Sequence, residues 1–220
     1  MTISAQRSWD AYNDLLLHGD VDRFTKLLAR YELYRMVIEL PGDIVEGGVF
    51  KGAGLLYWAK LIEIFNPRTS RRVIGFDTFQ GYPDSGREYE RDNARAFERS
   101  TDYQPKGAES LAQIAQSQGL QQRIELVPGG VGSSVREYVQ ANPGFRIALL
   151  NLDFDTYDST KAMLEACYEL VVPRGVVVLD EYAARQWGES DAVDEFLKQK
   201  GIALRAFPWT HSPSAYFIKP

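Results

Sequence analysis

The sequence of 220 residues contains only one cysteine, Cys167. A single cysteine excludes an internal disulfide bond and is typical of a protein that works in a reducing compartment. The chain also lacks any apolar run close to the ~20 residues that a membrane-spanning helix needs, and its polar first residues do not resemble a secretory signal. We therefore expect a cytoplasmic protein without a membrane partner.

An excess of positive charge is missing as well, since the formal net charge is -5. Such a balance disfavours nucleic acid and anionic membrane surfaces as partners. Hydrophobic residues make up 45% of the chain, which indicates a globular protein rather than a disordered one. The length fits one domain, so we expect residues 1–220 to form a single unit, with an N-terminal helical cap at 1–41 and a core at 42–220.

Strand-like and helix-like segments alternate after the helical N-terminal region, in which Ser8 and Asp20 are the predicted N-caps of two helices. This alternation predicts a Rossmann-like α/β fold with a mostly parallel sheet and helices on both faces. The last two strands have no helix between them, so we expect an antiparallel hairpin at the edge. The expected strands are 43–46, 72–77, 124–127, 147–152, 176–179, 203–207 and 215–218, and the expected helices are 52–65, 108–118, 134–140, 159–170 and 191–200.

Acidic side chains stand at the ends of four of these strands. They are Glu46, Asp77, Asp153, Asp180 and Glu181. An acid at the end of a buried strand loses hydration and needs a partner, and ligands of parallel sheets bind beyond the carboxyl ends of the strands. Any one of these acids is explained equally well as the N-cap of the following helix, but five acids at four strand ends favour a functional site.

The first of these acids opens the glycine-rich segment EGGVFKG at 46–52. Glycines allow a tight turn and a close approach to a ligand, and the spacing matches neither the dinucleotide fingerprint nor a P-loop. An acid before the glycines suits the ammonium group of S-adenosylmethionine and would repel a pyrophosphate; a tight turn without a ligand is the alternative. Asp77 is placed to accept hydrogen bonds from ribose hydroxyls, and the loop at 128–133 is expected near the adenine. The predicted cofactor-binding residues are Glu46, Gly47, Gly48, Gly52, Asp77, Gly130, Ser133 and Asp153.

Asp153, Asp180 and Glu181 end neighbouring strands in the expected strand order. Three carboxylates at short range would repel one another and raise each other's pKa, and a divalent cation removes that penalty. Oxygen ligands without a cluster of histidine and cysteine point to Mg²⁺, with Mn²⁺ and Ca²⁺ as alternatives. The alternative is that Asp153 and Asp155 face different ways and that Glu181 is solvated.

Four arginines recur at every fourth residue of the polar stretch at 83–105: Arg87, Arg91, Arg95 and Arg99. On a helix they would form one basic stripe. The stripe is either a solvated face paired with neighbouring acids or a lid that meets an anionic substrate such as a nucleotide-linked sugar. The aromatic face of the N-terminal helices also leaves two interpretations open, a cover over the cleft or the contact of a homodimer.

Four segments, in this order, share the pattern of one known family. They are GDIVEGGVFKG at 42–52, GFDTFQGYP at 75–83, LDFDTYDST at 152–160 and GVVVLDEY at 175–182. Together they resemble the macrocin O-methyltransferase family, whose enzymes methylate sugar hydroxyls in macrolide and aminocoumarin antibiotic pathways. The resemblance implies a class I methyltransferase fold with S-adenosylmethionine and Mg²⁺ as cofactors.

By this resemblance, Asp153, Asp180 and Glu181 match the metal-binding positions, and Asp153 also matches the catalytic base. The family usually has Asp-Asp where this chain has Asp180-Glu181, so the last ligand is one methylene longer. A Mg²⁺ ion there would hold two vicinal oxygens of the acceptor and lower the pKa of one hydroxyl, and Asp153 would take the proton. The expected reaction is methyl transfer to a hydroxyl of a small-molecule substrate, a sugar or a sugar-bearing natural product.

Three other functions stay open at this point. A catechol or phenolic O-methyltransferase shares the acidic metal site and differs in its acceptor. A nicotinamide-dependent sugar oxidoreductase is less favoured, because it needs the fingerprint G-x-G-x-x-G and a hydride-site pair, neither of which stands out in the sequence. A non-catalytic binding module with this fold would be expected to have lost the strand-end acids.

Overall fold

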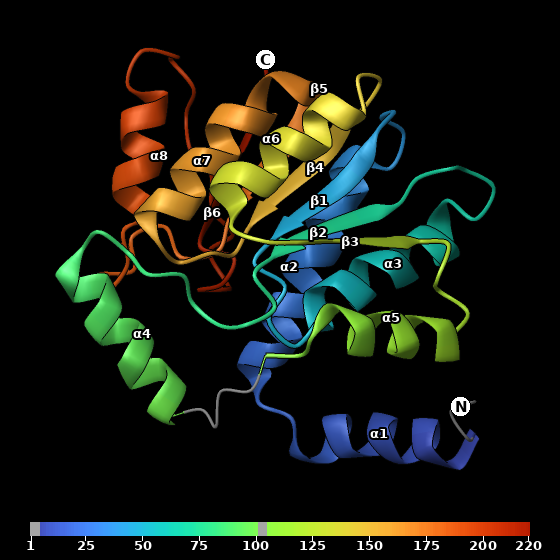
Figure 1. Ribbon diagram of the computed structural model, residues 1–220. Coiled ribbons are helices and arrows are strands. Elements are labelled where there is room, and N and C mark those ends of the chain that lie inside the picture. Colours follow the sequence, from blue (N-terminus) through green and yellow to red (C-terminus); the bar gives the residue numbers. More distant parts are fainter. Residues whose placement is uncertain (1–4, 101–104) are drawn as a thin grey trace.

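A six-stranded sheet lies at the centre of the computed structural model, which describes residues 5–100 and 105–220. The strands are β1 (Asp43–Gly47), β2 (Val73–Asp77), β3 (Ile124–Pro128), β4 (Ile147–Leu152), β5 (Val171–Leu179) and β6 (Ala215–Ile218). Their order across the sheet is β3-β2-β1-β4-β5-β6 (Figure 1). The first five strands run parallel and β6 runs antiparallel to β5, which confirms the predicted fold class.

Helices cover both faces of the sheet, and this explains why its central strands are almost entirely apolar. The helices are α1 (Ala5–His18), α2 (Val21–Val37), α3 (Ala53–Phe65), α4 (Glu88–Ser100), α5 (Ala108–Ser117), α6 (Val131–Ala141), α7 (Tyr157–Cys167) and α8 (Glu189–Leu197), with a 3-10 turn, η1 (Tyr168–Leu170), after α7. Helices α2, α3 and α5 pack on one face; α6 and α7 pack on the other, with α8 beside α7 (Figure 1). All residues of β4 are buried, as expected for a strand between two helical layers.

Helix α2 brings its first turns to the carboxyl end of the sheet. It begins after Asp20, whose side chain accepts a hydrogen bond from the backbone N–H of Asp22 at 3.1 Å, and this is the N-cap that the sequence predicted. Leu33 and Tyr34, further along the helix, are fully buried in the core, and the helix contacts β4 and β5. Polar side chains from the first turns of α2 can therefore reach the ends of these two strands.

The prediction of an antiparallel hairpin at the edge of the sheet is wrong for the first of its two strands. Residues 203–207 form no strand, and only Arg205 exchanges a pair of backbone hydrogen bonds with Tyr216 of β6, at 2.8 Å each. Phe207 stacks its ring on that of Tyr216, with ring centroids 5.2 Å apart, and Pro208 has no backbone N–H to donate to a strand. The segment therefore packs an aromatic side chain against β6 rather than extending the sheet.

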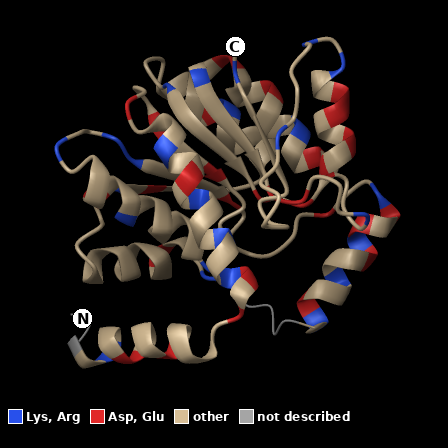
Figure 2. Ribbon diagram, turned by 180° about the vertical axis from the view of Figure 1, so that it is seen from behind, with Lys and Arg blue, Asp and Glu red and all other residues tan. Residues whose placement is uncertain are grey.

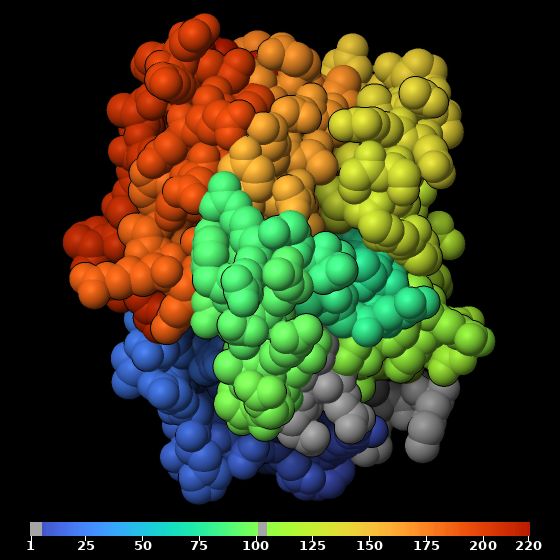
Figure 3. All heavy atoms as spheres, turned by 60° about the vertical axis from the view of Figure 1, so that its left-hand side comes forward, coloured from blue at the N-terminus to red at the C-terminus, as the bar shows by residue number. Residues whose placement is uncertain are grey.

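The polar stretch at 83–105 contains α4, and its residues 101–104 lie outside the described part of the chain. Helix α4 lies across the boundary between the N-terminal and C-terminal parts of the molecule (Figure 3). Asn93 connects it to the C-terminal part, because its side chain donates to the backbone carbonyl of Gln186. Basic and acidic positions are interspersed along this helix (Figure 2), so it does not present a surface of one charge.

Helix α1 lies apart from the sheet, at the edge of the molecule (Figure 1). Ser8 lies within this helix rather than at its start, so its predicted role as an N-cap is wrong. Trp9 and Tyr12 stack on each other at 5.8 Å and are both exposed. No helix within 5–100 or 105–220 is both long enough and apolar enough to span a membrane.

Candidate functional site

A cleft of about 740 Å³ opens at the carboxyl ends of the parallel strands. Its walls come from the loops after β1, β2, β4 and β5, from the start of α2 and from the turn before β6. Some of the predicted site residues line it, namely Glu46, Gly48, Asp77, Asp153, Asp180 and Glu181. The structure thus brings all the strand-end acids to one cleft, as expected for an open parallel sheet.

The loop after β1 depends on glycine at two positions. Gly48 has a φ of +83°, and a Cβ at this position would lie 1.9 Å from the backbone oxygen of Asp153. Gly52 has a φ of +80° as the N-cap of α3, and a Cβ there would meet the side chain of Leu111 at 2.4 Å. A left-handed φ is unfavourable for any residue with a side chain, so glycine is what lets this loop lie against the residue that follows β4.

Glu46 carries a buried carboxylate at the edge of the cleft. Its side chain is 2% exposed, and its Oε2 accepts no hydrogen bond from any described residue. Arg30 Nη2 lies 3.9 Å from the other oxygen, Oε1. Burial raises the pKa of Glu46 to about 8, although Arg30 opposes the rise. A further cation would stabilise the charged form of this carboxyl group, so the residue fits the ammonium end of an amino-acid-like ligand.

Asp77 holds the glycine loop in place. Its Oδ2 accepts hydrogen bonds from the backbone N–H groups of Val49 and Phe50, at 2.6 and 3.0 Å. Its Oδ1 accepts a hydrogen bond from the backbone N–H of Phe79 at 2.7 Å. These donors use much of the capacity of the carboxylate, so the binding of ribose hydroxyls by Asp77 stays a prediction.

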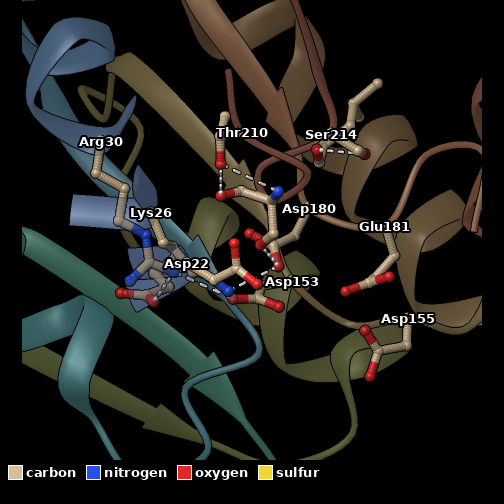
Figure 4. Close-up of polar contacts among 12 residues, drawn as sticks. Asp22, Lys26, Arg30, Asp153, Asp155, Asp180, Glu181, Thr210 and Ser214 are labelled. Atoms are coloured by element: carbon tan, nitrogen blue, oxygen red, sulfur yellow. Dashed lines mark hydrogen bonds and ion pairs between the residues drawn. The ribbon is translucent and has the colours of Figure 1, made fainter. Parts of the chain in front are cut away.

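Two cations from α2 lie among the acids that follow β4 and β5 (Figure 4). Lys26 Nζ donates to Asp180 Oδ2 at 2.8 Å and lies 3.6 Å from Asp153 Oδ2. Arg30 Nη2 donates to the same oxygen of Asp153 at 3.2 Å. Burial raises the pKa of Asp153 to about 6, and the charge of Asp180 adds to the rise. Burial acts in the same direction on Asp180, but Lys26 and Arg30 outweigh it and lower the pKa of that residue.

Glu181 faces Asp155 rather than Lys26 (Figure 4). Burial raises the pKa of Glu181 to about 8, with the charge of Asp155 as the next cause. Burial also raises the pKa of Asp155 to about 7, helped by the charge of Asp153, while the hydroxyl of Tyr82 donates to Asp155 and opposes the rise. The acids of the cleft therefore fall into two groups. Asp153 and Asp180 pair with basic residues of α2, whereas Asp155 and Glu181 form no ion pair with any residue that the structure describes.

The three predicted metal ligands do not surround a common centre. Within 5–100 and 105–220, no group of three or more Asp, Glu, His or Cys side chains is arranged to hold a metal ion. The ammonium group of Lys26 pairs with both Asp153 and Asp180, and Glu181 is turned toward Asp155. This arrangement does not fit the octahedral oxygen site that Mg²⁺ requires, so Asp153, Asp180 and Glu181 are not placed as the sequence-based prediction of a Mg²⁺ site needs.

The other predicted cofactor residues lie outside the lining of the cleft. Gly47 and Gly52 pack against neighbouring side chains of the protein. Gly130 and Ser133 are exposed at the start of α6, where the backbone N–H of Ser133 donates to the carbonyl of Gly130 at 3.1 Å. Between them, Val131 does line the cleft. This loop thus borders the cleft through an apolar side chain, and its contact with an adenine stays a prediction.

Aromatic side chains form a further wall of the cleft. Tyr82 stacks on Trp187 with ring centroids 5.5 Å apart and meets Phe97 of α4 edge-on at 6.2 Å. Phe97 also contacts Phe50 of the glycine loop, with centroids 6.4 Å apart. All four side chains line the cleft. They offer apolar surfaces to a ring-shaped ligand next to the acidic rim.

The arginine stripe lies beside the cleft rather than in it. None of its four arginines is among the described residues that line the cleft. Arg87 pairs with Asp191 of α8, and Arg95 lies 3.6 Å from Asp92 in the same helix. These contacts favour the interpretation as a solvated, partly paired face.

Sequence reasoning missed Lys26, Arg30 and Trp187. The two basic residues continue the helical stripe of Leu33 and Val37, which are fully buried in the core. Charged residues that lie on a buried stripe nearly always pair with an opposite charge. Their spacing was therefore a signal that the start of α2 packs against acidic residues. For Trp187, which lies in the loop before α8, the sequence contains no such signal.

Comparison with known proteins finds relatives over most of the chain. The family model for macrocin O-methyltransferase (TylF) matches residues 22–210. The 8-demethyl-8-(2,3-dimethoxy-alpha-L-rhamnosyl)-tetracenomycin-C 4'-O-methyltransferase of Streptomyces olivaceus is 27% identical over 171 residues, which cover 74% of this chain and 61% of that relative. The chain therefore spans less than two thirds of the length of this relative.

Solved structures agree with this comparison. The crystal structure of CalS11, a calicheamicin methyltransferase, is 31% identical and matches with a TM-score of 0.78 over 98% of this chain and 86% of its own. An apo structure of CalS11, there called a TDP-rhamnose 3'-O-methyltransferase, is also 31% identical and has a TM-score of 0.71 over 98% of this chain and 88% of its own. With its class I methyltransferase sheet and a family match that extends well beyond half of its length, the chain belongs to the macrocin O-methyltransferase (TylF) family.

Proposed function

We propose that this protein is an S-adenosylmethionine-dependent O-methyltransferase that acts on a hydroxyl group of a sugar. The observation that carries the proposal is the buried carboxylate of Glu46, whose Oε2 has no hydrogen-bond partner among the described residues and which borders the cleft together with Asp153. A buried acid of this kind is stabilised by a cationic ligand. S-adenosylmethionine carries an ammonium and a sulfonium group, whereas an acidic rim would repel the pyrophosphate of a nicotinamide cofactor.

The residues around Glu46 fit this cofactor. Gly48 lines the cleft and lets the loop pack directly against the backbone of Asp153, and Glu46 supplies the unpartnered oxygen. We assign the amino-acid end of the cofactor to these two residues, with Asp77 fixing the loop that contains Gly48. When bound, the cofactor supplies a methyl group on a sulfonium, which is a good leaving group.

Asp153 is the residue that we assign as the general base. Its pKa of about 6, raised by burial and then by Asp180, is closer to neutral pH than that of an ordinary carboxylate, which favours proton transfer. Asp153 would accept the proton of the acceptor hydroxyl as this oxygen takes the methyl group, and the cofactor would leave as the neutral thioether. Arg30 and Lys26 lie 3.2 and 3.6 Å from its Oδ2 and orient the carboxylate. No step of this mechanism passes through Mg²⁺, since the acids do not fit a metal centre.

The aromatic wall and the relatives support a sugar as the acceptor. Tyr82, Phe97 and Trp187 offer flat apolar surfaces against which the C–H face of a sugar ring can pack. One relative is named for methyl transfer to a rhamnosyl-bearing tetracenomycin and another for methyl transfer to TDP-rhamnose. We propose an acceptor of the rhamnose type, linked to a natural product or to a nucleotide whose pyrophosphate lies outside the acidic rim.

A methyl-transfer assay tests this function. The purified protein is incubated with S-adenosylmethionine and, in separate reactions, with TDP-rhamnose, a rhamnosylated polyketide and catechol, and the products are analysed by mass spectrometry. We expect one added methyl group on a sugar hydroxyl, and little product with the Asp153→Asn variant. Methylation of catechol alone would contradict the sugar acceptor, and a protein that neither transfers methyl nor binds S-adenosylhomocysteine would contradict the reaction itself.

A further inference from the structure

Lys26 of α2 is mostly buried and forms ion pairs with two acidic residues. Lys26 Nζ is shared between two carboxylates from two different strand ends, Asp180 Oδ2 at 2.8 Å and Asp153 Oδ2 at 3.6 Å. Figure 4 shows the side chain pointing from α2 into the space between these acids. The ammonium group therefore sits where a cation that bridges the two acids would sit.

The carboxylate of Asp180 depends on this lysine. Asp180 is 2% exposed, and its Oδ1 has no hydrogen-bond partner among the described residues. Its Oδ2 accepts hydrogen bonds from Lys26 and from the hydroxyl of Ser212, each at 2.8 Å. A buried charge is stable only with an opposite charge and hydrogen bonds, and among the residues that the structure describes Lys26 is the cation within ion-pair distance of this carboxylate.

Lys26 and a divalent cation would compete for the same oxygens. Mg²⁺ needs oxygen ligands at about 2.0–2.1 Å in octahedral geometry, and neither of the two Oδ2 atoms can approach a metal this closely while the ammonium group lies between them. Arg30 adds a second positive charge at 3.2 Å from Asp153 Oδ2. Both basic side chains are supplied by the same helix, four residues apart.

We infer that Lys26 takes the place of a bridging divalent cation between Asp153 and Asp180, so that the folded protein does not bind Mg²⁺ at these acids. Lys26 is in this view a positioning residue, which holds the two strand ends together and orients Asp153. The inference concerns the binding of a metal alone and goes beyond the proposed methyl transfer. Its failure would leave that reaction untouched.

Calorimetric titration of the full chain with MgCl₂ tests the inference. The wild-type protein is compared with Lys26→Met, which removes the ammonium group, and with Lys26→Arg, which keeps the charge. Lys51→Met is the matched control, because Lys51 lines the same cleft and its loss changes the net charge equally. We expect saturable Mg²⁺ binding by Lys26→Met. The wild type, Lys26→Arg and Lys51→Met should show at most non-saturating binding, at least roughly tenfold weaker, within the usual range of coupling between competing ligands.

A second variant covers the case in which Lys26→Met folds poorly. Lys26→Gln keeps an amide that can donate to a carboxylate but removes the charge, and it should gain Mg²⁺ binding in the same way. Thermal unfolding gives an independent readout, since added Mg²⁺ should raise the Tm of the neutral variants and leave that of the wild type unchanged. Saturable micromolar Mg²⁺ binding by the wild type would overturn the inference, and so would the absence of any gain in both neutral variants.

Discussion

Replacing Glu46 by glutamine removes one negative charge beside the glycine loop and keeps the shape of the side chain. The carboxylate is 2% exposed and has an unpartnered Oε2, so a bound ammonium group would form a charge-assisted hydrogen bond in a site with little water. Such a bond contributes about 1.5–3 kcal/mol, which corresponds to a roughly 10- to 150-fold weaker affinity when it is lost. The expected result for Glu46→Gln is therefore a loss of this size in affinity for S-adenosylhomocysteine.

Isothermal titration calorimetry near pH 8.5 measures this effect, because the wild-type carboxyl group is then mostly charged. The matched control is Glu63→Gln on α3, the same substitution at a half-exposed residue that pairs with Arg123 away from the cleft. The control should bind S-adenosylhomocysteine like the wild type. Equal affinities of Glu46→Gln and wild type would refute the assignment of the ammonium group to Glu46.

The pH dependence of binding gives a second test of the same residue. The pKa of Glu46 in the protein without ligand is about 8 because of burial, so below that pH the group must lose a proton before it can pair with an ammonium group. Affinity for S-adenosylhomocysteine should therefore rise between about pH 6.5 and pH 8.5, by at most about tenfold per pH unit for one proton. In Glu46→Gln this part of the pH dependence should disappear; a wild-type affinity that falls over this range would contradict the sign of the effect.

The remaining predictions concern the base, the loop and the aromatic wall. Asp153→Asn should bind S-adenosylhomocysteine almost as the wild type does, yet lower kcat about 10²- to 10⁴-fold, the usual contribution of a general base; an unchanged kcat would exclude Asp153 from that role. Gly48→Ala should lower the Tm and abolish cofactor binding, because a Cβ would lie 1.9 Å from a backbone oxygen at a φ of +83° and such strain costs about 1–3 kcal/mol; wild-type Tm and binding would show that the loop adapts. Trp187→Ala should raise the KM for the sugar about 2- to 10-fold through the loss of ring contacts, and it should leave the affinity for S-adenosylhomocysteine unchanged. If the affinity for S-adenosylhomocysteine fell and the KM for the sugar did not change, the acceptor would bind elsewhere.

The sheet could be predicted because its strands are short apolar runs separated by helical segments. The run Ile147–Leu152 is buried at every position, which a strand between two helical layers requires. The segment 203–207 has similar composition, but at the edge of a sheet pairing depends on neighbours and not on the strand's own residues. In this segment the ring of Phe207 packs on Tyr216. The local sequence does not show whether the segment pairs with β6 as a strand or packs on it through a side chain.

The gathering of the acids could also be predicted, since the carboxyl ends of parallel strands meet at one edge. The partners of these acids could not. Which cation reaches Asp180 depends on how α2 packs against β4 and β5, a long-range contact between residues 154 positions apart. Likewise Asp77 binds the backbone of Val49 and Phe50 because of the path of the glycine loop, and the sequence alone contains no sign of it.

A crystal structure of the protein with S-adenosylhomocysteine, grown in the presence of MgCl₂, tests the account most directly. We predict the amino group of the ligand at the carboxylate of Glu46 and the ammonium group of Lys26 between Asp153 and Asp180. A nucleoside bound away from Glu46, or a metal ion between the two aspartates with Lys26 turned outward, would contradict it.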